Sequence, residues 1–169
     1  WRFTITGIYP QILLRNQKNE TQVIITTHSP YFVSCEKFDK VRMVRKCYDK
    51  EASSVTGTNY QKLEERISSA LNTKPGSPSS LMARVSQIMY PSQSELFFSS
   101  LPVFVEGVED VAYLSTQIAL SDQTEDFKRL GCHFVVAGGK NNMSRLVAIA
   151  LELKQPVFVI LYISLEVLL

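Results

Sequence analysis

Three apolar runs separated by two helical patterns dominate the second half of the chain. These runs, rich in Val and Phe, are Leu101–Glu106, Cys132–Ala137 and Val157–Ile163. The intervening segments, Glu109–Leu120 and Asn142–Leu153, carry apolar residues at helical spacing. Gly107 and Gly138-Gly139 supply turns after the first two runs. Because strands that alternate with helices at this spacing pair in parallel, the sequence predicts βαβ units and a parallel α/β sheet.

The first half predicts two strands of different character. Gln22–Thr27 (QVIITT) is a β-branched run, typical of a strand buried on both faces of a parallel sheet. Lys40–Lys46 alternates apolar and basic residues, which predicts one buried and one solvated face. The polar segment Lys50–Thr58 is expected to be a loop.

Two helices and a linker are expected between the halves. From Asn59 onward, Tyr60, Leu63, Ile67 and Leu71 recur at helical spacing, with Glu64, Glu65 and Arg66 predicted to face water. Asn72–Ser80, dense in Pro, Gly and Ser, is the expected linker. A second helix is expected over Leu81–Tyr90, with Leu81, Val85, Ile88 and Met89 on one face and Pro91 ending it.

The net charge of +2 conceals an asymmetry between the halves. Residues 1–100 hold 13 Lys and Arg against 8 Asp and Glu, whereas residues 101–169 hold 5 against 8. The basic excess includes Lys40, Arg42, Arg45 and Lys46. Such a run could contact a phosphate backbone, or it could be a solvated edge strand whose lysines discourage pairing with another sheet.

Cysteine and hydropathy patterns limit the class of protein. The three cysteines include no CxxC pair and only two histidines accompany them, so no zinc template fits. Reduced thiols in a cytoplasmic protein are expected. The longest apolar stretch, Pro156–Leu165, is shorter than the ~18–20 residues that cross a bilayer, so no membrane association is expected.

Glu106 and Asp110 form the strongest candidate site. Glu106 ends a predicted buried strand, and Asp110 falls in the first turn of the following helix. Carboxyl ends of parallel strands are where α/β sheets place ligands, and two carboxylates there could hold a hard cation such as Mg²⁺. The alternative is a pair of acids that cap the helix.

Two further residues could contact phosphate. Lys140 follows Gly138-Gly139 at a strand-to-helix turn, although GGKNN is not a phosphate loop of the GxxxxGK[ST] type. His28 follows a predicted strand and could touch a γ-phosphate, although a histidine at a strand end is also common as a structural residue.

Together these segments resemble the OLD family of ATP-dependent nucleases. Val23–Val33 (VIITTHSPYFV) is similar to the last core strand and switch-histidine loop of ABC-type ATPases. Val103–Leu114 (VFVEGVEDVAYL) resembles the first strand and helix of a Toprim domain, and Phe134–Asn142 (FVVAGGKNN) resembles its next strand and turn. The expected fold is thus the end of an ABC-type ATPase sheet followed by a partial Toprim-like parallel α/β sheet. The expected domains are residues 1–50, a helical connector at 51–100 with its linker at 72–80, and a partial Toprim domain at 101–169.

The resemblance implies a homo-oligomeric protein that couples ATP binding and hydrolysis to metal-dependent DNA cleavage. It implies that His28 senses the γ-phosphate of ATP. Glu106 and Asp110 would bind Mg²⁺ or Mn²⁺, and Lys140 would approach the scissile phosphate. It also favours DNA contact by Lys40, Arg42, Arg45 and Lys46.

The sequence departs from the family pattern near both ends. The Gly-rich phosphate loop is missing, and Phe3 and Ile5 stand where the Walker B acids are due. Tyr162 and Ser164 stand where an Asp-x-Asp pair is due, and the first residue is Trp1. The expectation is a fragment that alone neither hydrolyses ATP nor cuts DNA. The alternative is a non-catalytic nucleic-acid-binding or interaction remnant; the TTHSP segment disfavours other Toprim proteins such as primases and topoisomerases.

Overall fold

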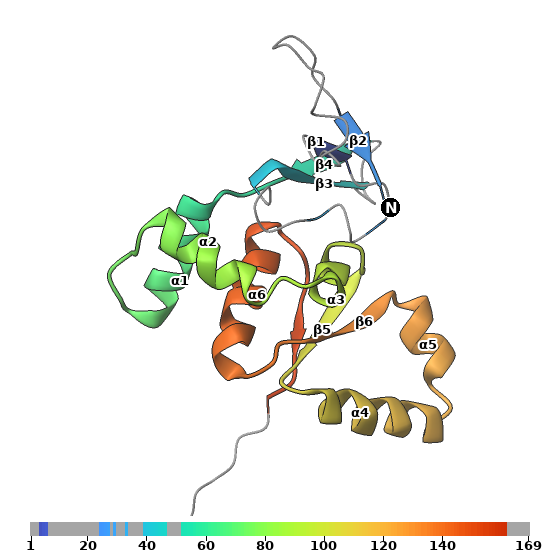
Figure 1. The fold of residues 1–169 in the computed structure, drawn as a ribbon. Helices are drawn as coiled ribbons and strands as arrows, with labels where there is room; N and C mark the ends of the chain where they lie inside the picture. Colours follow the sequence, from blue (N-terminus) through green and yellow to red (C-terminus); the bar gives the residue numbers. More distant parts are fainter. Residues whose placement is uncertain are drawn as a thin grey trace, which may run out of the picture.

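A three-stranded parallel sheet organises the second half of the protein. The computed structural model describes residues 4–6, 24–27, 29, 33, 39–46 and 52–161. In this part the sheet has the order β6-β5-β7, with both pairings parallel. Its strands are β5 (Leu101–Val105), β6 (Cys132–Val136) and β7 (Phe158–Val159). The predicted parallel α/β sheet is therefore confirmed (Figure 1).

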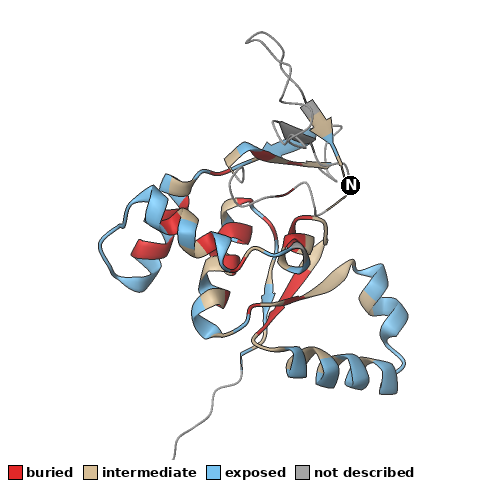
Figure 2. Cartoon of the chain, viewed as in Figure 1, coloured by how far each residue is buried: buried red, intermediate tan, exposed pale blue. Residues whose placement is uncertain are grey.

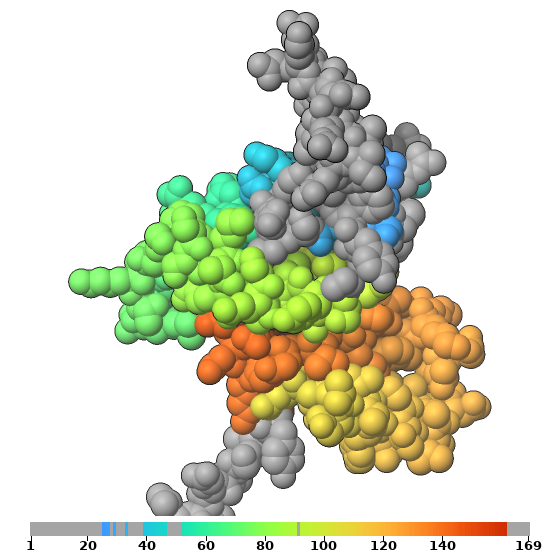
Figure 3. Space-filling view, viewed as in Figure 1, coloured from blue at the N-terminus to red at the C-terminus, as the bar shows by residue number. Residues whose placement is uncertain are grey.

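Helices connect these strands as the periodicity predicted. Helix α4 (Val108–Leu120) follows β5, and α6 (Lys140–Glu152) joins β6 to β7. A short helix missed by the sequence patterns, α5 (Thr124–Arg129), lies between α4 and β6. The figures show α4 and α5 together at one end of the molecule (Figures 1 and 3).

The first half forms a second sheet whose strands are all antiparallel. Its order is β2-β1-β3-β4, comprising β1 (Thr4–Thr6), β2 (Ile24–Thr26), β3 (Val41–Lys46) and β4 (Ser53–Thr56). The prediction of a parallel strand buried on both faces over 22–27 was wrong: β2 pairs antiparallel with β1, and Thr26 is exposed. The predicted loop at 50–58 was also wrong in part, because β4 pairs with β3 there.

Helices α1 and α2 pack against each other, and α1 also packs against α6 (Figure 1). Helix α1 (Tyr60–Leu71) begins at Asn59, whose side chain accepts a hydrogen bond from the Lys62 amide. Helix α2 (Pro78–Ser86) begins three residues earlier than expected, because Pro78 suits a first helical turn and Ser77 caps it.

Two sequence expectations about these helices need correction. Pro91 does not simply end a helix; it begins the short α3 (Pro91–Ser94), which leads into the 3₁₀ turn η4 (Glu95–Phe97). Glu64 does not face water, since it is only 5% exposed. Its carboxylate accepts hydrogen bonds from the Gly76 amide at 2.8 Å and pairs with Arg84 at 3.2 Å, which fastens the 72–77 segment to α1.

One hydrophobic cluster spans both sheets and the helices between them. It includes Met43 of β3, Leu63 of α1, Leu81 of α2, Phe104 of β5 and Leu146 of α6, each no more than 1% exposed. Figure 2 shows these buried segments concentrated where the central helices meet the strands. The described residues therefore share a continuous core, while the predicted domain boundaries stay a prediction.

Helix α4 departs from this pattern because none of its residues is buried. Of its expected apolar positions, Val111 and Ile118 are half-buried, whereas Val108 is 65% exposed. Tyr113 and Leu120 are also exposed, and α4 is largely pale blue in Figure 2. Among the described residues, no helix combines the length and apolar character needed to cross a bilayer.

Candidate functional site

Glu106 lies at the carboxyl edge of the parallel sheet, beside the turn after β6. Its carbonyl oxygen accepts hydrogen bonds from the Gly138 amide at 3.0 Å and the Gly139 amide at 3.2 Å. The preceding rung joins the Ala137 amide to the Val105 carbonyl at 2.9 Å. The two segments singled out in the sequence therefore meet at one edge, as the carboxyl ends of neighbouring parallel strands must.

Asp110 is held by the backbone of the same turn. Its Oδ2 accepts a hydrogen bond from the Gly107 amide at 2.9 Å, which caps the start of α4. The capping interpretation of this acid is therefore correct, and it orients the carboxylate toward the end of β5. Oδ1 makes no hydrogen bond with any described residue, so a ligand could still use it.

A third carboxylate, Glu109, lies over this turn, but it is exposed and is not assigned to the site. A side chain at Gly107 would place its Cβ 2.5 Å from Glu109 Oε2, so the Glu109 side chain would have to move aside. Its place in the first turn of α4 suits an acid that interacts favourably with the helix dipole.

Lys140 is the first residue of α6 and is exposed. The two glycines before it have φ values of 68° and 115°, which L side chains rarely adopt, so glycine is required in this turn. Their amides already donate to the Glu106 carbonyl oxygen, so the two glycines themselves offer no free amide to a phosphate.

The carboxylates at this edge could supply only some of the oxygen ligands that a hard divalent cation needs. The Glu106 carboxylate is half-buried and has no hydrogen-bond or ion-pair partner among the described residues. Within the same part of the chain, no group of three or more His, Cys, Asp or Glu residues is placed to hold a metal. Two carboxylates suit an ion such as Mg²⁺ that keeps several waters and takes further oxygens from a substrate.

Several predicted site residues fall outside the described residues or lie far from this edge. His28, Tyr162 and Ser164 lie outside the described part of the chain. Lys40 and Arg42 belong to the antiparallel sheet region, where Lys40 is exposed and pairs with Asp39 at 3.2 Å.

Arg45 and Lys46 end the same strand in different environments. Lys46 is exposed. Arg45 Nη1 donates to the carbonyl oxygens of Leu153 at 2.8 Å and Lys154 at 3.1 Å, at the carboxyl end of α6. Desolvation by burial lowers the pKa of Arg45 from its usual value. These contacts favour a structural role for Arg45, whereas the other three cations keep exposed surface.

A comparison with family models matches the segment that contains the parallel sheet. Residues 97–161 match the model of the Overcoming lysogenization defect protein-like TOPRIM domain. This segment is similar to an OLD-like Toprim domain. The match covers the Toprim-like segments at 103–114 and 134–142, and it confirms that resemblance. No curated protein matches the chain.

The OLD-like Toprim segment marks the protein as nuclease-related. The matched 65 residues are less than half of the 169-residue chain, and the match does not reach Val23–Val33. The ABC-type ATPase resemblance of that segment stays a prediction. Toprim domains typically bind divalent metal ions, which agrees with carboxylates at the end of β5.

Proposed function

We propose that the Glu106 edge serves divalent-metal-dependent DNA cleavage in an ATP-dependent endonuclease of the OLD type. The observation that carries this proposal is the meeting of Glu106 with the Gly138-Gly139-Lys140 turn at the carboxyl edge of an OLD-like Toprim sheet. Glu106 and Asp110 would hold Mg²⁺ or Mn²⁺ through carboxylate oxygens. The ion would supply charge stabilisation and water activation. Lys140 would approach the scissile phosphate and stabilise the charge that develops on it.

The proposed scheme includes an ATPase head in which His28 senses the γ-phosphate of ATP. Its support is the resemblance of Val23–Val33 to an ABC-type switch-histidine loop. The exposed Lys40 and Lys46, together with Arg42, are proposed to contact DNA electrostatically. The active species is proposed to be a homo-oligomer.

We further propose that this chain alone binds metal weakly and does not cut DNA. Tyr162 and Ser164 replace the Asp-x-Asp pair that the resemblance calls for. The proposed first shell therefore contains two carboxylates, one of which already accepts a hydrogen bond from Gly107.

The test measures Mn²⁺ binding and plasmid nicking by the full chain and three variants. Glu106→Gln is expected to weaken Mn²⁺ binding about tenfold or more, because it removes a charged ligand from the shell. Glu109→Gln, in the same turn, is the matched control and is expected to bind Mn²⁺ like the original chain. A Tyr162→Asp, Ser164→Asp double variant is expected to bind more tightly and to begin nicking plasmid. Equal Mn²⁺ affinity of the Glu106→Gln and Glu109→Gln variants would contradict the proposal.

The second candidate is a non-catalytic nucleic-acid-binding protein. The observation that favours it is the use of Asp110 Oδ2 as a helix cap, a role that needs no metal. In that case the chain binds DNA with strong salt dependence, yet Mn²⁺ does not bind and the double variant gains no activity.

A further inference from the structure

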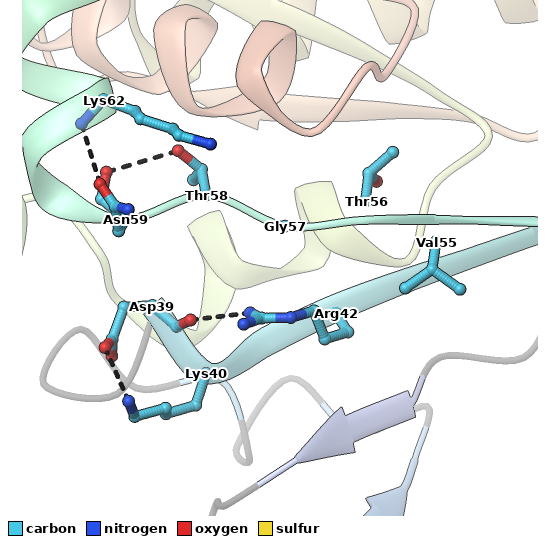
Figure 4. Close-up of a pocket in the computed structure, with 9 residues that line it drawn as sticks. All are labelled: Asp39, Lys40, Arg42, Val55, Thr56, Gly57, Thr58, Asn59 and Lys62. Carbon is cyan, nitrogen blue, oxygen red and sulfur yellow. Dashed lines mark hydrogen bonds and ion pairs between the residues drawn. The ribbon is translucent and has the colours of Figure 1, made fainter.

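A cationic pocket lies between the antiparallel sheet and the start of α1, outside the OLD-like Toprim segment. Its volume is about 430 Å³, within the range of about 300–1,000 Å³ typical of small-molecule sites. Arg42 of β3 lines it from one side and Lys62 of α1 from another, with Gly57 and Asn59 between them (Figure 4).

Arg42 is fixed in this pocket by one side of its guanidinium group. Nη1 donates to the carbonyl oxygens of Asp39 at 2.7 Å and Val41 at 2.8 Å. The Nε and Nη2 donors make no hydrogen bond with a described residue. A guanidinium held in this way presents the remaining donors as a preorganised fork, the geometry that binds phosphate oxygens in pairs.

Gly57 makes room for this arrangement. A Cβ at position 57 would lie 2.9 Å from both Cδ and Nη1 of Arg42 and 3.1 Å from the Val41 carbonyl oxygen. Any side chain there would press against Arg42 and the backbone that holds it. The pocket therefore depends on a glycine at this position.

The charge of the pocket is positive, and its acid is already neutralised. Asp39 is the acidic residue in the lining, and its carboxylate pairs with Lys40 at 3.2 Å, turned away from the Arg42 guanidinium (Figure 4). The Lys62 side chain is exposed and its ammonium has no hydrogen-bond or ion-pair partner among the described residues. The excess of two positive charges, Arg42 and Lys62, matches the charge of a phosphate monoester, about −1.5 to −2 at pH 7.

We propose that this pocket binds the phosphate monoester of a nucleotide, with Arg42 and Lys62 as its anion-binding residues. The cavity volume of about 430 Å³ exceeds that of a bare phosphate ion, so the proposed ligand carries a further group beside its phosphate. Either a free mononucleotide or the 5′-phosphorylated end of a nucleic-acid strand offers this chemistry. This inference goes beyond the proposed nuclease function, since it requires neither Glu106 nor a metal.

The experiment measures binding to the full chain in EDTA by titration calorimetry. The probes are adenosine 5′-monophosphate, adenosine, and one oligonucleotide with and without a 5′-phosphate. We expect adenosine 5′-monophosphate or the 5′-phosphorylated strand to bind, and adenosine and the unphosphorylated strand to bind at least about tenfold more weakly. Binding of the mononucleotide identifies a free ligand; binding of the phosphorylated strand alone identifies a strand end.

Lys62→Ala is the decisive variant, and Lys74→Ala is its matched control. Lys62 is an exposed helix position where alanine is well tolerated, and Lys74 is an exposed lysine that does not line the pocket. Lys62→Ala should weaken binding about tenfold, and Lys74→Ala should leave it unchanged. Gly57→Ala should also weaken binding, with folding checked by circular dichroism.

Three results would overturn the proposal. These are the absence of binding by either phosphorylated probe, equal binding with and without the phosphate, and equal affinity of the Lys62→Ala and Lys74→Ala variants. Glu106→Gln should leave this binding unchanged, so the pocket can fail while the nuclease proposal stands, and the reverse also holds.

Discussion

Replacing Arg45 with alanine should destabilise the protein by removing hydrogen bonds between β3 and the carboxyl end of α6. Arg45 lies on β3 of the antiparallel sheet, and its guanidinium donates to Leu153 and Lys154 at the carboxyl end of α6. These contacts join residues more than a hundred positions apart in the sequence. A cation at this end of a helix also interacts favourably with the helix dipole.

The expected loss is about 2 kcal/mol of unfolding free energy. Hydrogen bonds from a charged donor contribute about 1.5–3 kcal/mol, and a cation at a helix carboxyl end adds about 0.3–1 kcal/mol. The lower half of the combined range applies for two reasons. The Lys154 contact is exposed, and Leu153 keeps a second donor, Thr56 Oγ1 at 2.9 Å, after Arg45 is removed.

Urea unfolding followed by circular dichroism measures this loss. With an m-value of about 2 kcal/mol/M, the midpoint should fall by about 1 M. Lys46→Ala, at the next and exposed position of the same strand, is the control and should change stability by less than about 0.5 kcal/mol. If Arg45→Ala lowers the unfolding free energy no more than Lys46→Ala does, the contact of Arg45 with the end of α6 does not stabilise the fold, and its assignment as a nucleic-acid contact regains support.

Two further predictions concern the buried Glu64 and the half-buried Cys132. Glu64→Ala should lower the unfolding free energy by about 2 kcal/mol, because it leaves the Gly76 amide and Arg84 without the carboxylate that accepts from them. A double-mutant cycle with Arg84→Ala should give a non-zero coupling energy, and strict additivity would contradict the pairing. Burial raises the pKa of the Cys132 thiol, so the unfolded chain loses this proton at lower pH than the folded protein and stability should fall as the pH rises through the unfolded pKa. In a Cys35→Ser, Cys47→Ser variant, the midpoint of the alkylation rate against pH should exceed that of the urea-unfolded chain; an equal or lower midpoint would refute the assignment.

Hydrophobic periodicity was sufficient to predict the parallel sheet. The runs at 101–106 and 132–137 are too apolar for a half-solvated strand, and the helical segments between them force the strands to run in the same direction. The meeting of Glu106 with the Gly138-Gly139 turn follows from that topology, because both lie where parallel strands end. This part of the site was therefore predictable from the sequence.

The antiparallel sheet was not predictable because its pairing depends on distant partners. β4 (SSVT) is polar and mostly exposed, so nothing in its side chains favours a strand; backbone pairing with β3 creates it. The direction of β2 is likewise set by β1 and not by its own β-branched residues. Glu64 was predicted to be solvated from helical spacing alone, because two of its hydrogen-bond donors, the Gly76 amide and the Arg84 guanidinium, come from the 72–84 segment that folds back onto α1.

Because α4 is exposed, the two acids of the candidate site should unfold at different free energies. A 13-residue helix with no buried residue draws little stability from packing, and isolated helices of this length are marginal in water. Its backbone amides should therefore exchange with solvent through local unfolding at a free energy well below that of the core around Phe104 and Leu146. Asp110 unfolds with that first turn, whereas Glu106 remains attached to β5. A ligand that binds both carboxylates must hold α4 folded, so its affinity includes the free energy of ordering this helix.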